Sequence, residues 1–167
     1  MDDYFACLGI PRTYSLDMSD LDQRYLNACR QSHPDFQMAM GQGFVQAAEM
    51  QLSTLHLAYS VLTDSYRRAE HLLELVGGPN ANEHRAIPAE FMEQMFELRE
   101  RLVDLNGIHD QSRFQDEIEV LLQRADLNLG LGCENLSQPE NMVQLREMLN
   151  QVAFLRGILR DLDGKFG

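Results

Sequence analysis

The sequence has few cysteines and no long apolar run. Its three cysteines, Cys7, Cys29 and Cys133, are odd in number, and none forms a Cys-x-x-Cys pair. A disulfide framework or a zinc site is therefore not expected, and a reducing compartment suits the chain. No segment reaches the roughly 18 apolar residues of a membrane span. The N-terminus, Met1-Asp2-Asp3-Tyr4, lacks the basic start and the apolar core of a secretion signal. We therefore expect a soluble protein of the cytoplasm.

Basic side chains are also scarce. The chain has 14 lysines and arginines against 26 aspartates and glutamates, which gives a formal net charge of −12. Binding to phosphate groups needs clustered cations. Neither nucleic acid nor an anionic membrane is therefore expected as a partner.

Motifs of catalysis are missing as well. The sequence has no His-Glu-x-x-His pair, no glycine-rich phosphate loop and no nucleophile elbow. Of the five histidines, only His33 shares a local motif with a carboxylate, that of Asp35. The other four, His56, His71, His84 and His109, are expected to be lone surface residues. We expect no metal, no cofactor and no enzymatic activity.

The chain does carry helical periodicity from end to end, with no strand signal. In its first half, apolar residues recur at helical spacing over 4–10, 19–32, 44–63 and 65–76. Asp17 and Ser19 are candidate caps for the first long helix. The segment 77–82, Gly-Gly-Pro-Asn-Ala-Asn, then interrupts the pattern.

Three more helices are expected after this break, over 88–106, 111–125 and 139–162, with a less regular stretch over 127–139. Pro88 suits the first turn of a helix, and Gly107 suits its end. Short connections favour antiparallel neighbours, so the second half predicts a three-helix bundle. The fold class is all-α, with a first domain over 1–76, a linker over 77–86 and a bundle over 87–167.

Several apolar positions are expected to form the two cores. The inward positions of the first half are Leu21, Tyr25, Ala28, Cys29, Val45, Ala48, Leu52, Leu55, Tyr59, Leu62, Tyr66, Ala69, Leu72 and Leu73, with Tyr4, Phe5, Cys7 and Leu8 at the end. Those of the second half are Phe91, Met95, Leu98, Leu102, Leu105, Phe114, Ile118, Leu121, Leu122, Leu145, Met148, Leu149, Val152, Leu155 and Leu159.

The tripeptide His33-Pro34-Asp35 lies at the corner between the two long helices of the first half. Pro34 disfavours the α conformation for His33, so the first helix should end there. Downstream, residues 58–64 read Ala-Tyr-Ser-Val-Leu-Thr-Asp and residues 66–68 read Tyr-Arg-Arg. This arrangement resembles a J-domain, the ATPase-stimulating module of DnaJ-type co-chaperones. By itself the tripeptide also fits a plain helix stop with a capping aspartate.

The resemblance extends to one particular family. Residues 68–73, Arg-Ala-Glu-His-Leu-Leu, and residues 91–100, Phe-Met-Glu-Gln-Met-Phe-Glu-Leu-Arg-Glu, are similar to the HscB family of J-proteins dedicated to iron–sulfur cluster assembly. The similarity spans nearly the whole chain and is weakest over 125–140. It implies a J-domain that docks on an HscA/DnaK-class ATPase chaperone and a bundle that binds an IscU-type scaffold protein.

The resemblance also implies which residues make these contacts. The chaperone-binding residues would be His33, Pro34, Asp35, Arg24, Asn27 and Arg30. The scaffold-binding residues would be Phe91, Met92, Met95, Phe96, Glu97, Glu100 and Phe154. Helical spacing alone gives Phe91, Met95 and Phe154 a core role at least as readily as a binding role, whereas Met92 and Phe96 lie off the core stripe and favour binding.

The chain departs from these families at a few positions. Phe36 follows the tripeptide where J-domains commonly have a lysine, and Asp20 and Asp22 lie near Arg24. We therefore expect weaker and more salt-sensitive docking than for a strongly basic J-domain. Glu93 stands where HscB relatives usually carry an apolar residue. A general J-protein with another client, or a J-like adaptor that does not stimulate an ATPase, are the alternative functions.

Overall fold

The computed structural model describes residues 2–32, 42–106 and 108–166, with the side chains of 42–48, 108 and 166 left out. All regular structure in these ranges is helical, which confirms the all-α prediction. The chain divides into two compact units, Met1–Leu75 and Val76–Gly167. None of the helices in the described ranges is both long enough and apolar enough to cross a membrane.

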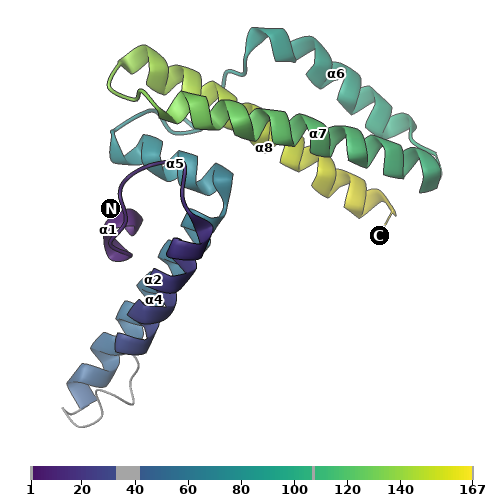
Figure 1. Ribbon diagram of the computed structural model, residues 1–167. Coiled ribbons are helices and arrows are strands. Elements are labelled where there is room, and N and C mark those ends of the chain that lie inside the picture. Colours follow the sequence, from purple (N-terminus) through teal and green to yellow (C-terminus); the bar gives the residue numbers. More distant parts are fainter. Residues whose placement is uncertain (1, 33–41, 107, 167) are drawn as a thin grey trace. The chain divides into compact units, whose positions relative to one another are not determined.

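The first unit is built on a helical hairpin. Helices α2 (Met18–Gln31) and α4 (Gln42–Thr63) lie side by side (Figure 1). The single-turn helix α1 (Tyr4–Cys7) packs on α4, and α5 (Ser65–Leu75) follows α4 after one residue. This is the hairpin with short flanking helices that the periodicity predicts.

Local sequence explains where α2 begins and ends. The Asp17 carboxylate accepts the backbone N–H groups of Ser19, at 2.8 Å, and Asp20, at 3.3 Å, which satisfies two donors that the helix itself leaves unpaired. The predicted cap at Asp17 is confirmed. Helix α2 ends at Gln31, ahead of the proline as predicted, and the corner His33-Pro34-Asp35 itself lies outside the described residues.

The core of the first unit is apolar and collects residues from all four of its described helices. Of the predicted inward positions, Tyr4, Tyr25, Ala28, Cys29, Leu52, Tyr59 and Tyr66 are half-buried, and the side chains of Val45 and Ala48 are outside the described set. The buried apolar residues are Phe5, Leu8, Ile10, Leu21, Leu55, Ala58, Val61, Leu62, Ala69, Leu72 and Leu73.

Two predictions for this unit are wrong. Cys7 is exposed, although it was expected in the core. In a helix of one turn, Phe5 and Leu8 share the inward side at spacing i, i+3, which leaves Cys7 on the other side. His71, expected at the surface, is only 3% exposed, because α1 covers this part of α5.

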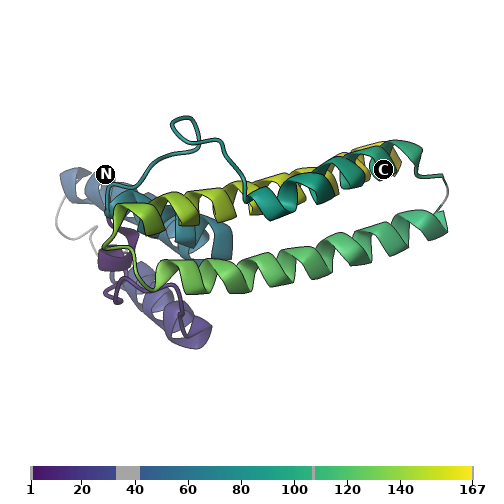
Figure 2. The ribbon, with the colours of Figure 1, turned by 90° about the horizontal axis from the view of Figure 1, so that it is seen from above.

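The second unit consists of three helices that lie lengthwise along one another (Figure 2). They are α6 (Ala89–Asp104), α7 (Ile108–Cys133) and α8 (Pro139–Phe166). The predicted three-helix bundle is thus confirmed. Pro88 is the N-cap of α6 and not part of its first turn. Met95, Leu105, Leu121, Leu122, Met148 and Leu159 are half-buried, and the other predicted inward positions of this unit are buried.

Helix α7 is much longer than predicted. The sequence indicates an end near Ala125 and an irregular stretch thereafter, yet the helix continues to Cys133. Glycine disfavours helix, but packing overrides this propensity here, because Leu129 is fully buried and Gly132 lies directly against α8. A Cβ atom at Gly132 would lie 3.1 Å from Met148 Sδ and 3.2 Å from Leu145 Cδ1. The glycine therefore permits the close approach of α7 and α8.

Polar contacts attach the C-terminal end of α6 to α8. The Lys165 ammonium group, near the end of α8, donates to the carbonyl oxygens of Leu102, Val103 and Leu105 at 2.8–3.0 Å. These carbonyls belong to the end of a helix, where unpaired acceptors and the helix dipole both favour a cation. Lys165 thereby joins the last turns of α6 and α8.

An ion pair joins the same end of α6 to α7. Arg101 donates two hydrogen bonds to Glu117, at 2.8 and 2.6 Å, and its guanidinium lies over the Phe114 ring. The hydrogen bonds from Arg101 lower the pKa of Glu117 below its ordinary value. The position of α6 in the bundle is therefore set at its C-terminal end by contacts to both partner helices.

The segment before α6, expected to be a linker, is fastened to α8. The Asn150 side-chain amide donates to the carbonyl oxygens of His84, at 3.0 Å, and Ala86, at 2.7 Å. The His84 ring also lies 3.0 Å from the Glu147 carboxylate. Residues 84–86 therefore belong to the bundle.

Candidate functional site

The residues predicted to bind a partner fall into two groups, one in each unit. In the first unit they are the corner His33-Pro34-Asp35, which lies outside the described residues, and three polar residues of α2. Arg24, Asn27 and Arg30 are all exposed. At spacing i, i+3, i+6 they lie on one broad side of α2. The structure thus exposes all three as predicted.

Arg24 is nevertheless held within its own unit. Its Nε donates to the Asp20 carboxylate at 2.8 Å, and its Nη1 donates to the carbonyl oxygen of Gly9 at 2.7 Å. Gly9 adopts a positive φ of 64°, a conformation that glycine reaches without strain, and it directs this carbonyl at α2. Arg24 therefore contributes to the junction between the α1 loop and α2, which leaves Arg30 as the cation nearer the corner.

A ladder of aromatic and polar groups joins α2 to α4. The rings of Tyr25 and Tyr59 are stacked with centroids 4.1 Å apart. The Tyr59 hydroxyl donates to the Asp22 carboxylate at 2.8 Å, and this hydrogen bond raises the pKa of Tyr59. The Tyr25 hydroxyl lies 2.6 Å from His56 Nδ1. Asp22 and His56, although both are exposed, thus help to hold the hairpin together.

In the second unit, α6 carries an exposed apolar row. Met92 is 46% exposed, Phe96 is 61% exposed and Val103 is 76% exposed. With Arg99 they occur at spacing i, i+4, i+7 and i+11, so the four side chains share one side of the helix. We call Met92, Phe96, Arg99 and Val103 the α6 row. Apolar side chains aligned in this way on a surface are typical of a protein-binding site.

Phe154 of α8 adjoins this row. Its ring packs edge-to-face on Phe91, with centroids 5.9 Å apart, and the Arg99 guanidinium lies 5.3 Å from its centre. Arg99 is itself held by Asp161 of α8 at 2.7 Å. Phe91 is buried and Phe154 is half-buried. These contacts give Phe91 a core role and put Phe154 at the boundary between the core and the surface.

An acidic row runs beside the α6 row. Glu93, Glu97, Glu100 and Asp104 are all exposed and follow each other at spacing i, i+4, i+7 and i+11. Each lies one residue along from a member of the α6 row, so the two rows are neighbours on the helix surface. We call these four residues the acidic row. A partner that covers both rows must combine an apolar patch with basic side chains.

The structure thus brings most of the predicted scaffold-binding residues to one surface. Met92, Phe96, Glu97 and Glu100 are exposed on adjoining sides of α6. Met95 is half-buried beside them, and Phe91 lies beneath. Glu93, noted from the sequence as a departure from the HscB pattern, is exposed on this surface as well. Arg99, Val103 and Asp104 were not predicted as members of it, and the i, i+4, i+7, i+11 spacing was the available signal for all three.

Within the described ranges, no group of three or more histidine, cysteine, aspartate or glutamate side chains is arranged to hold a metal ion. One cavity of about 250 Å³ lies beside the start of α6, lined among others by Phe91, Gln94, Arg124 and Gln151. Its lining is mainly polar.

No family model matches the chain. Solved structures of other proteins share its fold over almost its full length, among them the two that follow. The structure of human co-chaperone protein HscB has a TM-score of 0.83 at 20% sequence identity, and the match covers 99% of this chain and 82% of the human chain. Chaperone HscB from Vibrio cholerae has a TM-score of 0.76 at 22% identity, over 98% of this chain and 97% of the other. The chain therefore has an HscB-type fold.

Proposed function

We propose that this chain is a co-chaperone of iron–sulfur cluster assembly. Residues 1–76 would act as a J-domain that stimulates the ATPase of an HscA/DnaK-class chaperone. Residues 87–167, together with residues 84–86 that are held on α8, would bind an IscU-type scaffold protein, with 77–83 as the connection. The observation that carries the proposal is that His33-Pro34-Asp35 lies between α2 and α4 in a chain with an HscB-type fold.

The chemistry of the corner suits docking on a chaperone. Asp35 can accept charge-assisted hydrogen bonds from an arginine of the chaperone, each worth roughly 1.5–3 kcal/mol. Pro34 restricts the backbone before binding, so less conformational entropy is lost in the complex. Asn27 and Arg30, exposed on α2, would extend this contact. Arg30 supplies the positive charge that attracts an acidic chaperone surface.

The surface of α6 suits a scaffold protein. Met92 and Phe96 offer an apolar contact, and Glu97 and Glu100 offer hydrogen-bond acceptors beside it. Methionine adapts its shape to a partner, and aromatic residues often carry much of the binding energy of an interface. Met95, Phe91 and Phe154 would support this surface from below, since they pack at or near the core.

Two binding units in one chain would couple ATP hydrolysis to the presence of the client. When the bundle holds the scaffold, the chaperone bound at the first unit meets it at a high effective concentration. Hydrolysis would then occur mainly when a scaffold is ready for capture. Three cysteines with no Cys-x-x-Cys pair fit a reducing compartment, such as the cytoplasm, as the place where this happens.

A J-like adaptor without ATPase stimulation is the second candidate function. It is favoured by one observation, the engagement of Arg24 with Asp20 and the Gly9 carbonyl, which reduces the positive charge available on α2. Phe36, where J-domains commonly have a lysine, also lowers the positive charge available for docking on a chaperone.

The experiment that separates the two functions is steady-state ATP turnover by an HscA-class chaperone. Turnover is measured alone, with the chain, and with its His33→Gln variant. A J-domain predicts stimulation by the chain that the variant loses. Equal turnover in all three mixtures would contradict ATPase stimulation and favour the J-like adaptor.

A further inference from the structure

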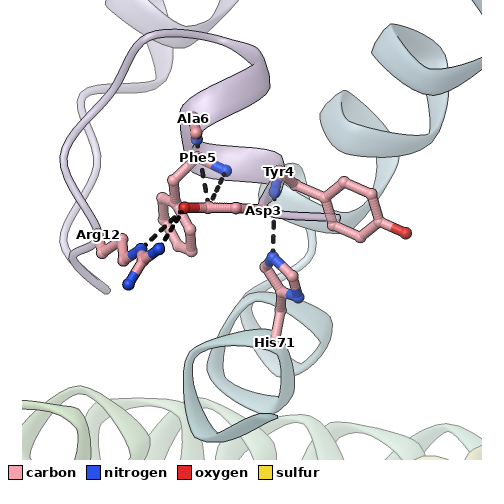
Figure 3. A network of polar contacts seen from close by, with 6 residues as sticks. All are labelled: Asp3, Tyr4, Phe5, Ala6, Arg12 and His71. Carbon is pink, nitrogen blue, oxygen red and sulfur yellow. Dashed lines mark hydrogen bonds and ion pairs between the residues drawn. The ribbon is translucent and has the colours of Figure 1, made fainter. Parts of the chain in front are cut away.

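A single histidine fastens α1 to α5. The backbone N–H of Tyr4 donates to Nε2 of His71 at 3.1 Å (Figure 3). The His71 ring also lies against the Tyr4 ring, with centroids 4.5 Å apart, and nearly parallel to the Phe5 ring at 5.8 Å. His71 is 3% exposed and Phe5 is fully buried. The first helix is thus attached to α5 through the ring of one buried histidine.

The direction of this hydrogen bond fixes where the proton of His71 lies. A backbone N–H can only donate, so Nε2 must be the unprotonated nitrogen of the ring. The ring is then neutral and carries its proton on Nδ1. This nitrogen lies 3.7 Å from the Glu74 carboxylate, one turn further along α5.

The charged groups around His71 come from three parts of the unit. Glu74 lies on α5, Asp3 is the residue that caps α1, and Arg12 lies in the loop that follows α1. Asp3 accepts the N–H groups of Phe5 and Ala6 and is paired with Arg12 at 2.7 Å. Burial lowers the pKa of His71 and outweighs the Glu74 and Asp3 carboxylates, which act in the opposite direction.

We propose that neutral His71 holds α1 on α5 and that α1 is released when His71 binds a proton. A proton on Nε2 would set two donors, the ring N–H and the Tyr4 N–H, against each other. It would also put a positive charge on a ring that is only 3% exposed, and burial of a charge is costly. Both effects act on the same contact, so acidification should loosen α1 from α5.

The sign and size of the effect follow from proton linkage. In the released state, His71 has its ordinary pKa near 6.5, above that of the docked state. The docked state is therefore fully stable above about pH 6.5 and loses stability as the pH falls toward the lower pKa. One proton changes the docking equilibrium by at most tenfold per pH unit in this window. Although burial acts to raise the pKa of Asp3, Arg12 and the capped N–H groups keep it below its ordinary value, so Asp3 stays ionised throughout.

Amide hydrogen exchange of the full chain tests this proposal. Protection of the amides of residues 4–8 is measured at pH 7.5, 6.5 and 5.5 and corrected for the intrinsic pH dependence of exchange. Protection should fall below pH 6.5, by up to tenfold per pH unit. In His71→Gln the side-chain carbonyl can still accept a hydrogen bond but does not titrate, so protection should not vary with pH. His84→Gln, which removes a histidine of the other unit, should behave like the wild type.

Nitrogen chemical shifts of the wild-type imidazole ring provide a second readout that does not depend on any variant. They should identify His71 as the Nδ1-protonated tautomer at pH 7.5, with a titration midpoint below the ordinary one. A titration at the ordinary pKa with unchanged protection of residues 4–8 would overturn the proposal. So would a loss of protection in His71→Gln equal to that of the wild type.

Discussion

The guanidinium group of Arg99 lies over the ring of Phe154, 5.3 Å from its centre, and thereby joins the exposed side of α6 to α8. Arg99 shares that side with Met92, Phe96 and Val103. Because Asp161 of α8 pairs with Arg99, the α6 row is attached to a second helix of the bundle. A preformed surface of this kind loses little entropy when a partner binds.

Replacing Met92 and Phe96 together by serine should weaken scaffold binding at least tenfold and leave the helical circular dichroism unchanged. Both side chains are exposed, so their loss removes contact area for a partner but little core packing. Isothermal titration calorimetry with an IscU-type scaffold measures the affinity. Val120→Ser/Leu127→Ser is the matched control, since these residues of α7 are 63% and 73% exposed. Equal losses in the two double variants would contradict the assignment of the site to α6.

Phe154→Ala should affect stability more than Phe96→Ala does. Phe154 is half-buried against Phe91 and Arg99, so its truncation should lower the free energy of unfolding by about 2 kcal/mol. Phe96 is mostly exposed, and its truncation should change that free energy by less than about 0.5 kcal/mol. Denaturant unfolding of both variants measures the difference. If Phe154→Ala were neutral for stability but abolished scaffold binding, Phe154 would be a contact residue and not a support.

The two arginines of α2 should have separable roles. Arg24→Ala removes the bond to the Gly9 carbonyl and should lower the free energy of unfolding by about 1 kcal/mol. Arg30→Ala should leave stability unchanged to within about 0.5 kcal/mol but reduce the association rate with the chaperone, most clearly at low salt. Stopped-flow binding and denaturant unfolding report these two effects. An unaltered association rate in Arg30→Ala would remove Arg30 from the docking surface.

Asn150→Ala should detach the segment before α6 from the bundle. The variant loses both bonds to the His84 and Ala86 carbonyls, so amide exchange over residues 84–87 should accelerate. Asn141→Ala provides the control, since Asn141 lies on the same helix and donates to the carbonyl of Asn135 in the α7–α8 turn. Faster exchange of residues 84–87 in both variants would mean that this segment responds to general loosening of α8.

Helical periodicity is sufficient to predict the number, order and inward sides of most helices, because each long helix is amphipathic and has its own breaks. Asp17 and Pro88 even indicate where two helices begin. The length of α7 could not be predicted in this way, because Gly132 is tolerated only through its close approach to Leu145 and Met148 of α8. Helix propensity reflects only residues that are close in the sequence, so it cannot predict the effect of a contact between two helices.

In the functional surfaces, too, some features follow from local sequence and others depend on tertiary contacts. The exposure of Met92 and Phe96 follows from their position off the core stripe, and the sequence predicts it correctly. The engagement of Arg24 and the burial of His71 depend on partners 15 and 67 residues away in the sequence, so no local pattern indicates them. A charged or titratable side chain within a helix reveals its role only when its tertiary partner is known.

The most direct test of the proposed function is the scaffold-dependent part of ATP turnover by an HscA-class chaperone. Turnover is measured with chaperone and IscU-type scaffold, and with either the wild-type chain or Met92→Ser/Phe96→Ser. We predict that the wild type raises turnover further when scaffold is present. The variant should keep the stimulation that is independent of scaffold but lose most of the additional increase. Identical scaffold-dependent increases for the two proteins, or no increase with the wild type, would contradict the claim that this chain delivers a scaffold to the chaperone.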